Sequence, residues 1–266
     1  MKILRTVEEV RRALEPRRPT SEIGLVPTMG AFHEGHLSLF RAARRECDVV
    51  VVSLFVNPAQ FGPGEDLNRY PSDEEGDARL AEGEGVDFLF RPDLDEVYPK
   101  GFQTWVEVED LSRPLEGEHR PGHFRGVATI CLKLFNVVRP HRAYFGQKDA
   151  QQAAVVRRMV EDLNLPIEIR LLPTVRGPDG LALSSRNAYL SPEERQAALA
   201  LSRALQAGTA SDDPVRAARK VLDEEPLLDL DYLEVADLNG QPVLLVAARV
   251  GKTRLIDNAP LRGDPR

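Results

Sequence analysis

The strongest constraint on the fold is a series of short apolar runs that alternate with segments of helical spacing. The runs are rich in β-branched residues and apolar on both faces, which is typical of strands in a parallel sheet covered on both sides by helices. Because crossover connections between parallel strands are right-handed, the alternation predicts a doubly wound α/β sheet. The expected strands are 22–28, 48–58, 86–92, 142–147 and 167–175, and the expected helices are one after HEGH at 33–36 and those at 73–85, 129–138 and 149–164.

The chain changes character from about residue 176. Ser191 and Pro192 read as a helix cap with proline in the first turn, opening a helix over 191–208. A second helix is expected near 212–224, followed by short strands at 230–237 and 241–250. We therefore expect a Rossmann-like domain over residues 1–175 and a smaller α+β C-terminal lid domain over 176–266, joined by a Gly/Pro-rich hinge.

Charge and cysteine usage exclude several classes of protein. The net charge is −7 and no window concentrates Lys and Arg, which argues against a nucleic-acid partner. Cys47 and Cys131 both lie in apolar patterns, as buried thiols of a reducing compartment do. No segment approaches the roughly 18 apolar residues of a membrane span, and the charged amino terminus lacks an apolar signal core. We expect a cytoplasmic protein without a membrane partner.

Polar residues follow four of the expected strands. In open α/β sheets, ligands bind beyond the carboxyl ends of the strands, so these residues are candidates for one shared crevice. They are PTMGAFHEGH at 27–36 after the first strand, Asn57 and Gln60 after the second, Lys148, Asp149 and Gln152 after a later strand, and Ser184, Ser185 and Arg186 after the last.

His33 and His36 stand three residues apart where a helix is expected to begin, so they share one face of it. A zinc site would need more ligands, for which His119 and His123 are the candidates, and the spacing is not that of an HExxH helix. A second alternative is that His33 caps the helix while His36 is a core histidine. A helix start facing the crevice favours phosphate instead, because free N–H groups and the helix dipole attract anions.

The HxGH pattern and the late Ser/Arg-rich segment resemble the HIGH and KMSKS pair of the nucleotidyltransferase superfamily. Five stretches together resemble the pantoate–β-alanine ligase (pantothenate synthetase) family, in that family's order and over nearly the whole chain. They are PTMGAFHEGHLSL, VSLFVNPAQFGPGEDLNRYPSD, RPGHFRGVATICLKLFN, YFGQKDAQQ and LALSSRNAYLS. One departure is Leu183, where the family commonly has Met.

The resemblance implies an ATP-dependent ligase reaction. The carboxylate of (R)-pantoate attacks the α-phosphorus of ATP, releases pyrophosphate and forms pantoyl adenylate. The amine of β-alanine then attacks the acyl carbon and releases AMP, which yields pantothenate. The resemblance also implies ATP as a substrate with Mg²⁺, a Rossmann-like ATP- and pantoate-binding domain, and a homodimer.

Residue roles follow from the resemblance where the motifs match. His36, His33 and Lys148 are the expected catalytic residues, with Lys148 beside the α-phosphate. The expected ATP-binding residues are Thr28, Met29, Gly30, His33, His36, Gly146, Lys148, Asp149, Val175, Leu183, Ser184, Ser185 and Arg186. The expected pantoate- or β-alanine-binding residues are Gln60, Gln152 and Asn57, because an amide both donates and accepts. No metal held by protein ligands alone is expected.

Purely structural roles stay open as alternatives for several of these residues. Asn57 would serve as a simple loop cap, and Lys148 would be a solvated surface lysine. The loop at 61–77 is interpreted as a lid with Tyr70 in its wall, or as an ordinary solvated loop. The segment at 119–125, which contains His123, is interpreted as a second flexible rim or as another solvated loop.

Three other function classes also stay open. A nucleotidyltransferase acting on a phosphorylated cofactor precursor should need a further basic cluster for the acceptor phosphate. A fragment of an aminoacyl-tRNA synthetase should need a basic face for tRNA, which the net charge of −7 does not favour. A non-catalytic nucleotide sensor would not need Gln60 and Gln152 in addition to Lys148.

Overall fold

A computed structural model describes residues 1–261 of the chain. The chain forms two compact units. Unit 1 comprises residues 1–145 and 155–172, and unit 2 comprises residues 146–154 and the chain from residue 173 onward. The domain boundary expected after residue 175 stays a prediction.

Unit 1 is built on a six-stranded parallel sheet with the strand order β1-β4-β3-β2-β5-β6. The strands are β1 (Lys2–Leu4), β2 (Ile23–Thr28), β3 (Val49–Leu54), β4 (Phe88–Phe90), β5 (Arg142–Gly146) and β6 (Glu168–Leu172). From β2 the chain builds β3 and β4 outward on one side, and then adds β5 and β6 on the other. The strand order therefore reverses beside β2, which is where open α/β sheets bind ligands.

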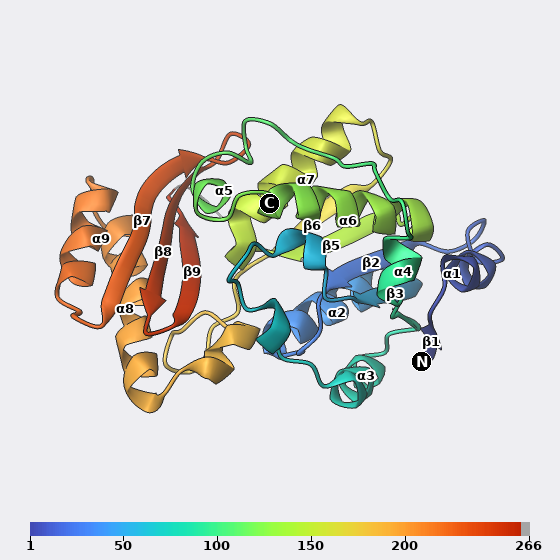
Figure 1. The fold of residues 1–266 in the computed structure, drawn as a ribbon, viewed down its shortest axis with the longest axis horizontal. Coiled ribbons are helices and arrows are strands. Elements are labelled where there is room, and N and C mark those ends of the chain that lie inside the picture. The colour runs from blue at the N-terminus through green and yellow to red at the C-terminus, as the bar shows by residue number, and fades with distance from the viewer. Residues whose placement is uncertain (262–266) are drawn as a thin grey trace. The chain divides into compact units, whose positions relative to one another are not determined.

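Helices cover both faces of this sheet. Helices α2 (Glu34–Glu46) and α3 (Glu74–Gly83) pack on one face, and α6 (His123–Val138) lies on the other (Figure 1). Helix α1 (Val7–Leu14) contacts α6, and α7 (Ala150–Asp162) begins in unit 2 and continues in unit 1. The shorter elements are α4 (Leu94–Val97), α5 (Glu116–His119) and the 3₁₀ turns η1 (Pro58–Gln60) and η2 (Leu67–Arg69).

Unit 2 contains a three-stranded antiparallel sheet with the order β7-β8-β9. Its strands are β7 (Leu228–Asp237), β8 (Pro242–Val250) and β9 (Thr253–Pro260), and helices α8 (Pro192–Thr209) and α9 (Pro214–Asp223) pack against this sheet (Figure 1). Leu201 of α8 and Leu244 of β8 lie in the buried cluster between them. The 3₁₀ turns η3 (Gln147–Asp149) and η4 (Ser185–Tyr189) also belong to this unit.

The predicted fold class, a doubly wound parallel sheet followed by a smaller α+β region, is confirmed. Five helices and strands were not predicted, namely β1, α1, α4, α5 and β9. Strand β1 has only three residues, too few to show a period, and the eight-residue α1 buries only Val10 and Leu14. Strand β9 carries Asp257 and Asn258 in buried positions, which breaks the apolar alternation of a strand. In the described part of the chain, no helix is both long and apolar enough to cross a membrane.

Phe40→Ala is expected to lower the free energy of unfolding by about 3–5 kcal/mol, because it leaves a cavity under α2. Phe40 is fully buried, and its ring meets the ring of Phe32 edge-on at 5.1 Å. Leu80→Ala on α3 is the control, since Leu80 is 40 % exposed and should cost only about 0.5 kcal/mol. Urea unfolding followed by circular dichroism measures both, and equal losses would contradict the placement of Phe40 in the core.

Candidate active site

The predicted site residues divide between the two compact units. Those in unit 1 lie at the end of β2 or in the segments after β2 and β3, and are Thr28, Met29, Gly30, His33, His36, Asn57 and Gln60. Those in unit 2 lie on η3 and its flanks and on the segment from residue 173 to η4, and are Gly146, Lys148, Asp149, Gln152, Val175, Leu183, Ser184, Ser185 and Arg186.

His33 and His36 together form the amino-terminal cap of α2. Nδ1 of His33 accepts the N–H of Gly35 at 3.1 Å, and Nδ1 of His36 accepts the N–H of His33 at 3.3 Å. The two ring centroids are 4.2 Å apart, so the rings share one face as predicted. The capping role weighed for His33 is confirmed, whereas His36 is half-buried rather than a core residue.

This cap fixes the tautomer of both rings. Because each Nδ1 accepts a hydrogen bond, each neutral imidazole carries its proton on Nε2. Two N–H donors therefore accompany the positive end of the α2 dipole. Such an arrangement suits an anion and disfavours a metal cation.

Asp77 of α3 holds the turn that leads from β2 into α2. Its carboxylate accepts the N–H of Ala31 at 2.7 Å and the N–H of Phe32 at 2.6 Å. Gly30 has φ +93°, and a Cβ on it would lie 2.9 Å from Oδ2 of Asp77, so the turn needs glycine for both conformation and space. Burial raises the pKa of Asp77, and the two amide hydrogen bonds oppose that rise.

Asp77 was not predicted as a site residue. It is 3 % exposed, on the same helix as the fully buried Ala81. The available sequence signal was therefore a carboxylate on the apolar face of an amphipathic helix.

The ends of β2 and β3 meet through the amide of Gln60, as the sequence predicted for neighbouring strand ends. Oε1 of Gln60 accepts from Nδ2 of Asn57 at 3.1 Å, and Nε2 lies 2.9 Å from Sδ of Met29. Thr28 joins the same strands, since its hydroxyl donates to the carbonyl of Ser53 at 2.6 Å. The side chain of Gln60, which the sequence predicts as a pantoate ligand, is thus held in a defined orientation.

Asn57 uses its whole hydrogen-bonding capacity within the protein. Oδ1 accepts from the N–H of Ala59 at 3.3 Å and from the hydroxyl of Tyr98 at 2.9 Å. Nδ2 donates to Gln60 and to the carbonyl of Gly126 at 3.2 Å. A primary amide has two N–H donors and an oxygen that can accept two hydrogen bonds. Asn57, which is 1 % exposed, therefore has every donor and acceptor satisfied. It caps η1 and orients Gln60.

His123 and Arg120 hold the main chain of Gln60 from the other side. His123 Nδ1 lies 2.8 Å from the carbonyl oxygen of Gln60, and Arg120 donates to the same oxygen at 3.3 Å. Arg120 also pairs with Glu65 at 2.7 Å and lies 3.2 Å from Nε2 of His123. Because a guanidinium can only donate, Nε2 of His123 is the acceptor and Nδ1 carries the proton.

The segment at 119–125 was interpreted as a flexible rim or a solvated loop, but its His123 is a buried residue at the start of α6. His123 is 7 % exposed and both of its ring nitrogens are engaged, which anchors the start of α6 on η1. Burial, with the charge of Arg120 as a second cause, lowers the pKa of His123 to about 4. Within residues 1–261 there is no group of three or more His, Cys, Asp or Glu side chains that could hold a metal ion.

In unit 2, Lys148 lies on η3 beside Asp149. Its ammonium is 3.0 Å from Oδ1 of Asp149, and its side chain is 20 % exposed. Lys148 is therefore not the solvated surface lysine that was weighed as the alternative. A Cβ on the preceding Gly146 would meet no protein atom within 4 Å, so the space beside its main chain is open. Gln152 follows in the first turn of α7.

The other predicted segment of unit 2 is a closed turn. The N–H of Leu183 donates to the carbonyl of Val175 at 3.0 Å, which ties its two ends together. Ser184 then caps η4, because its hydroxyl accepts the N–H of Arg186 at 3.3 Å. Ser185 is the first residue of η4. The candidate phosphate-binding side chains are thus carried on a short, hydrogen-bonded support.

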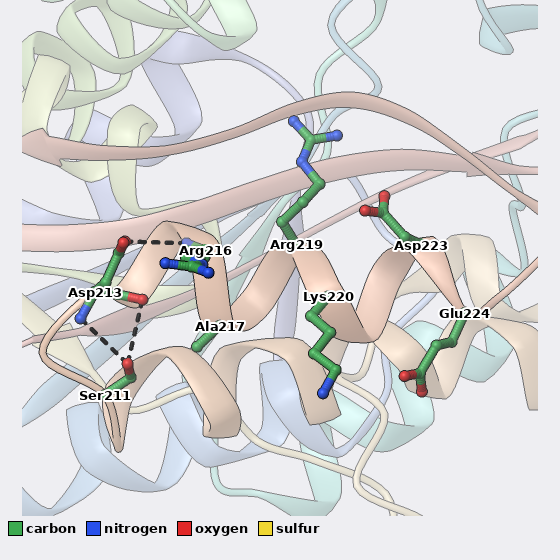
Figure 2. A pocket seen from close by; sticks show the side chains of 8 residues that line it. All are labelled: Ser211, Asp213, Arg216, Ala217, Arg219, Lys220, Asp223 and Glu224. Carbon is green, nitrogen blue, oxygen red and sulfur yellow. Dashed lines mark hydrogen bonds between the residues drawn. The ribbon is translucent and has the colours of Figure 1, made fainter.

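A separate hollow of about 730 Å³ lies along α9 (Figure 2). None of the predicted site residues lines it. Figure 2 shows Arg219 and Lys220 pointing in different directions, with Asp223 and Glu224 nearby, so its charges do not converge on one point. The hollow is therefore not a candidate for the reaction site.

Solved structures of known function resemble the whole chain. The crystal structure of pantothenate synthetase from Thermus thermophilus superimposes with a TM-score of 0.94 at 48% sequence identity, covering 99% of this chain and 100% of that one. The structure of pantoate-beta-alanine ligase from Francisella tularensis, complexed with beta-gamma ATP and beta-alanine, gives a TM-score of 0.87 at 33% identity and covers both chains fully, at 100% each.

Curated relatives agree over the same length. Pantothenate synthetase from Roseiflexus sp. (strain RS-1) is 54% identical over 98% of this chain and 99% of its own, and that from Moorella thermoacetica is 52% identical over the same shares. The family model described as Pantoate-beta-alanine ligase matches residues 2–260. The chain therefore belongs to the pantoate–β-alanine ligase family.

Proposed function

We propose that the protein condenses (R)-pantoate with β-alanine in pantothenate biosynthesis, at the expense of ATP. A carboxylate oxygen of pantoate attacks the α-phosphorus, the bond from that phosphorus to the bridging oxygen breaks, and pyrophosphate leaves. The β-alanine nitrogen then attacks the acyl carbon of pantoyl adenylate, loses a proton, and AMP leaves. The observation that carries this proposal is the family match over residues 2–260, together with a Francisella tularensis relative solved with beta-gamma ATP and beta-alanine.

His33, His36 and Lys148 are proposed to stabilise the charge that develops during adenylate formation. The Nε2–H groups and the α2 dipole supply positive potential for phosphate oxygens from unit 1. The ammonium of Lys148 is proposed to neutralise the α-phosphate oxygens in the pentacoordinate transition state. The many donors and the small number of arranged nucleophiles suit catalysis by positioning rather than by a covalent enzyme intermediate.

The remaining nucleotide contacts are proposed from the motif positions. The turn that Asp77 braces would shape the site for the nucleotide, and η4 would present its donors to the outer phosphates. The residues proposed for these ATP contacts, besides the catalytic three, are Thr28, Met29, Gly30, Gly146, Asp149, Val175, Leu183, Ser184, Ser185 and Arg186. The HxGH residues would in this way serve as a HIGH motif.

Gln60 and Gln152 are proposed to bind pantoate. An amide can donate to a carboxylate and accept from a hydroxyl without adding a charge. The satisfied hydrogen bonds of Asn57 support a positioning role, in which it orients Gln60 rather than touching the substrate.

Magnesium is proposed to arrive as part of the substrate MgATP. Mg²⁺ prefers phosphate oxygens and water to a cage of protein ligands. The donor sets of the described residues agree with this, since none groups three acidic, His or Cys side chains around one point. A homodimer, a cytoplasmic location and a lid role for residues 176–266 are also proposed, the first and last on the resemblance and the second on the two buried free thiols.

Pantoate-dependent exchange of labelled pyrophosphate into ATP, measured without β-alanine, tests the adenylate step. Wild-type protein should exchange, because the second substrate is not needed for that half-reaction. Lys148→Ala should slow the exchange by on the order of 10²-fold, as loss of a preorganised charge stabiliser does. The exposed Lys252→Ala is the control and should exchange normally. A requirement for β-alanine would exclude a free adenylate half-reaction, and full activity of Lys148→Ala would exclude the proposed role of Lys148.

Gln60→Ala should weaken pantoate binding by about tenfold or more while ATP binding changes less, because one amide hydrogen bond to a charged group is worth about 1.5–3 kcal/mol. Isothermal titration calorimetry with each ligand measures the two affinities. The exposed Gln206→Ala is the control. Parallel losses of both affinities would mean that Gln60 is only structural.

The pH dependence of stability should report the buried His123. Its folded pKa, about 4, lies below the ordinary value of 6.5, so the unfolded chain binds one more proton between these values. The free energy of unfolding should therefore fall by about 3 kcal/mol as the pH drops from 6.5 to 4. His123→Asn, which keeps a donor without titrating, should flatten that slope in urea unfolding, whereas His119→Asn at an exposed position should keep it. An unchanged slope in His123→Asn would refute a buried neutral histidine.

A further inference from the structure

Asn258 of β9 binds the main chain on both sides of Lys148. Its Nδ2 donates to the carbonyl oxygen of Gln147 at 2.8 Å and to the carbonyl oxygen of Lys148 at 2.8 Å. Its Oδ1 accepts from Nε2 of Gln147 at 3.0 Å. Asn258 is 3 % exposed and Gln147 is 5 % exposed, so these hydrogen bonds are shielded from water. All of these residues belong to unit 2.

The orientation of this amide is fixed by chemistry. The two carbonyl oxygens can only accept, so the nitrogen of Asn258 must face them and its oxygen must face Gln147. Oε1 of Gln147 is buried and has no hydrogen-bond partner, so the Gln147 side chain makes only the bond from Nε2 to Asn258. Reversing the Gln147 amide would place two oxygens together and lose this bond. The hydrogen bonds that hold the η3 main chain to β9 therefore depend on the Asn258 side chain.

Two adjacent peptide planes are held by one side chain. The carbonyl of Gln147 belongs to the peptide before the Cα of Lys148, and the carbonyl of Lys148 belongs to the peptide after it. Because each peptide is planar, fixing both planes fixes φ and ψ at Lys148. Those two angles determine the direction of its Cα–Cβ bond, and so the direction in which the lysine leaves the main chain.

The preceding residue of β9, Asp257, holds the second segment of unit 2 that carries predicted ATP-binding residues. Asp257 forms a bidentate ion pair with Arg176, at 2.6 Å and 3.0 Å, and is itself 3 % exposed. Arg176 follows Val175 directly, in the closed turn that leads to η4. Successive strand residues face opposite sides of a sheet, which lets one dipeptide of β9 hold two separate segments.

We propose that Asn258 is a positioning residue for Lys148, whose ammonium it directs toward the reacting phosphate. The proposal rests on the proposed function of Lys148 in adenylate formation. Asn258 itself is buried behind η3 and touches no reacting atom. Its loss should therefore change the rate of the chemical step more than the affinity for ATP, because a small displacement of a catalytic group can cost on the order of 10²-fold in rate.

The test measures pantoate-dependent pyrophosphate exchange in Asn258→Ala, Lys148→Ala and the double variant, all as full-length protein. Asn258→Ala should lower the exchange kcat by on the order of 10- to 10²-fold, with the KM for ATP changed about threefold or less. In the Lys148→Ala background, the same change should cost about twofold or less, since the group that it positions is absent. A general structural defect would instead multiply the two losses.

The control is Asn239→Gly. Asn239 also donates from Nδ2 to a carbonyl in unit 2, that of Ala154 at 3.2 Å, but outside η3. Its φ of +59° is accommodated by glycine, so the change removes the hydrogen bond without strain. This variant should keep the wild-type exchange kcat.

The outcomes distinguish a failure of the positioning role from a failure of the proposed function. Wild-type kcat in Asn258→Ala, or multiplicative losses in the double variant, would overturn the positioning role while leaving the ligase function intact. Absence of pantoate-dependent exchange in the wild-type protein would overturn the proposed function and the positioning role with it. If thermal melting shows Asn258→Ala to be unfolded, Asn258→Ser replaces it. The serine hydroxyl can donate to only one carbonyl at a time, so the same fall in kcat is expected. In the Lys148→Ala background, Asn258→Ser should again cost about twofold or less. Multiplicative losses of kcat would again overturn the proposal.

Discussion

The parallel pairing of β2 with β3 is the constraint on which the unit 1 part of the site depends. The register from Ile23↔Val49 to Thr28↔Leu54 ends both strands at the same edge of the sheet. The residues that follow must then share one small space, which places Gln60 against Met29. The strand order also contributes. The chain adds strands on one side of β2 and then on the other, so no crossover connection covers the carboxyl ends of the strands at this point.

Buried polar side chains hold either the backbone or the side chain of several candidate site residues. Asp77 binds the two amides before α2, Asn57 binds the amide of Gln60, and Asn258 binds the peptides around Lys148. Such bonds are made where water is excluded, so breaking one leaves a buried group unsatisfied. This physical cost explains how loops can hold reactive side chains with the rigidity that catalysis by positioning requires.

The histidines show how one residue type serves opposite purposes. His33 and His36 accept at Nδ1, and their neutral rings therefore carry donors at Nε2 at the start of a helix. His123 has the reverse tautomer, with a donor at Nδ1 and an acceptor at Nε2, and it is buried as a support for Gln60. In each case the hydrogen bond on one ring nitrogen decides what the other can do.

The sequence by itself determined the fold class, the main strands and the motif segments, because periodicity and strand-end chemistry are local signals. It also singled out Lys148, Gln60 and the histidine pair, whose residue types are unusual at strand ends. Only the tertiary structure revealed Asp77 and Asn258, which lie far along the chain from the loops they hold. It also showed that Asn57 caps η1 and binds the side-chain amide of Gln60. A hydrogen bond between segments distant in sequence leaves no periodic trace, since it depends on packing that only the folded chain creates.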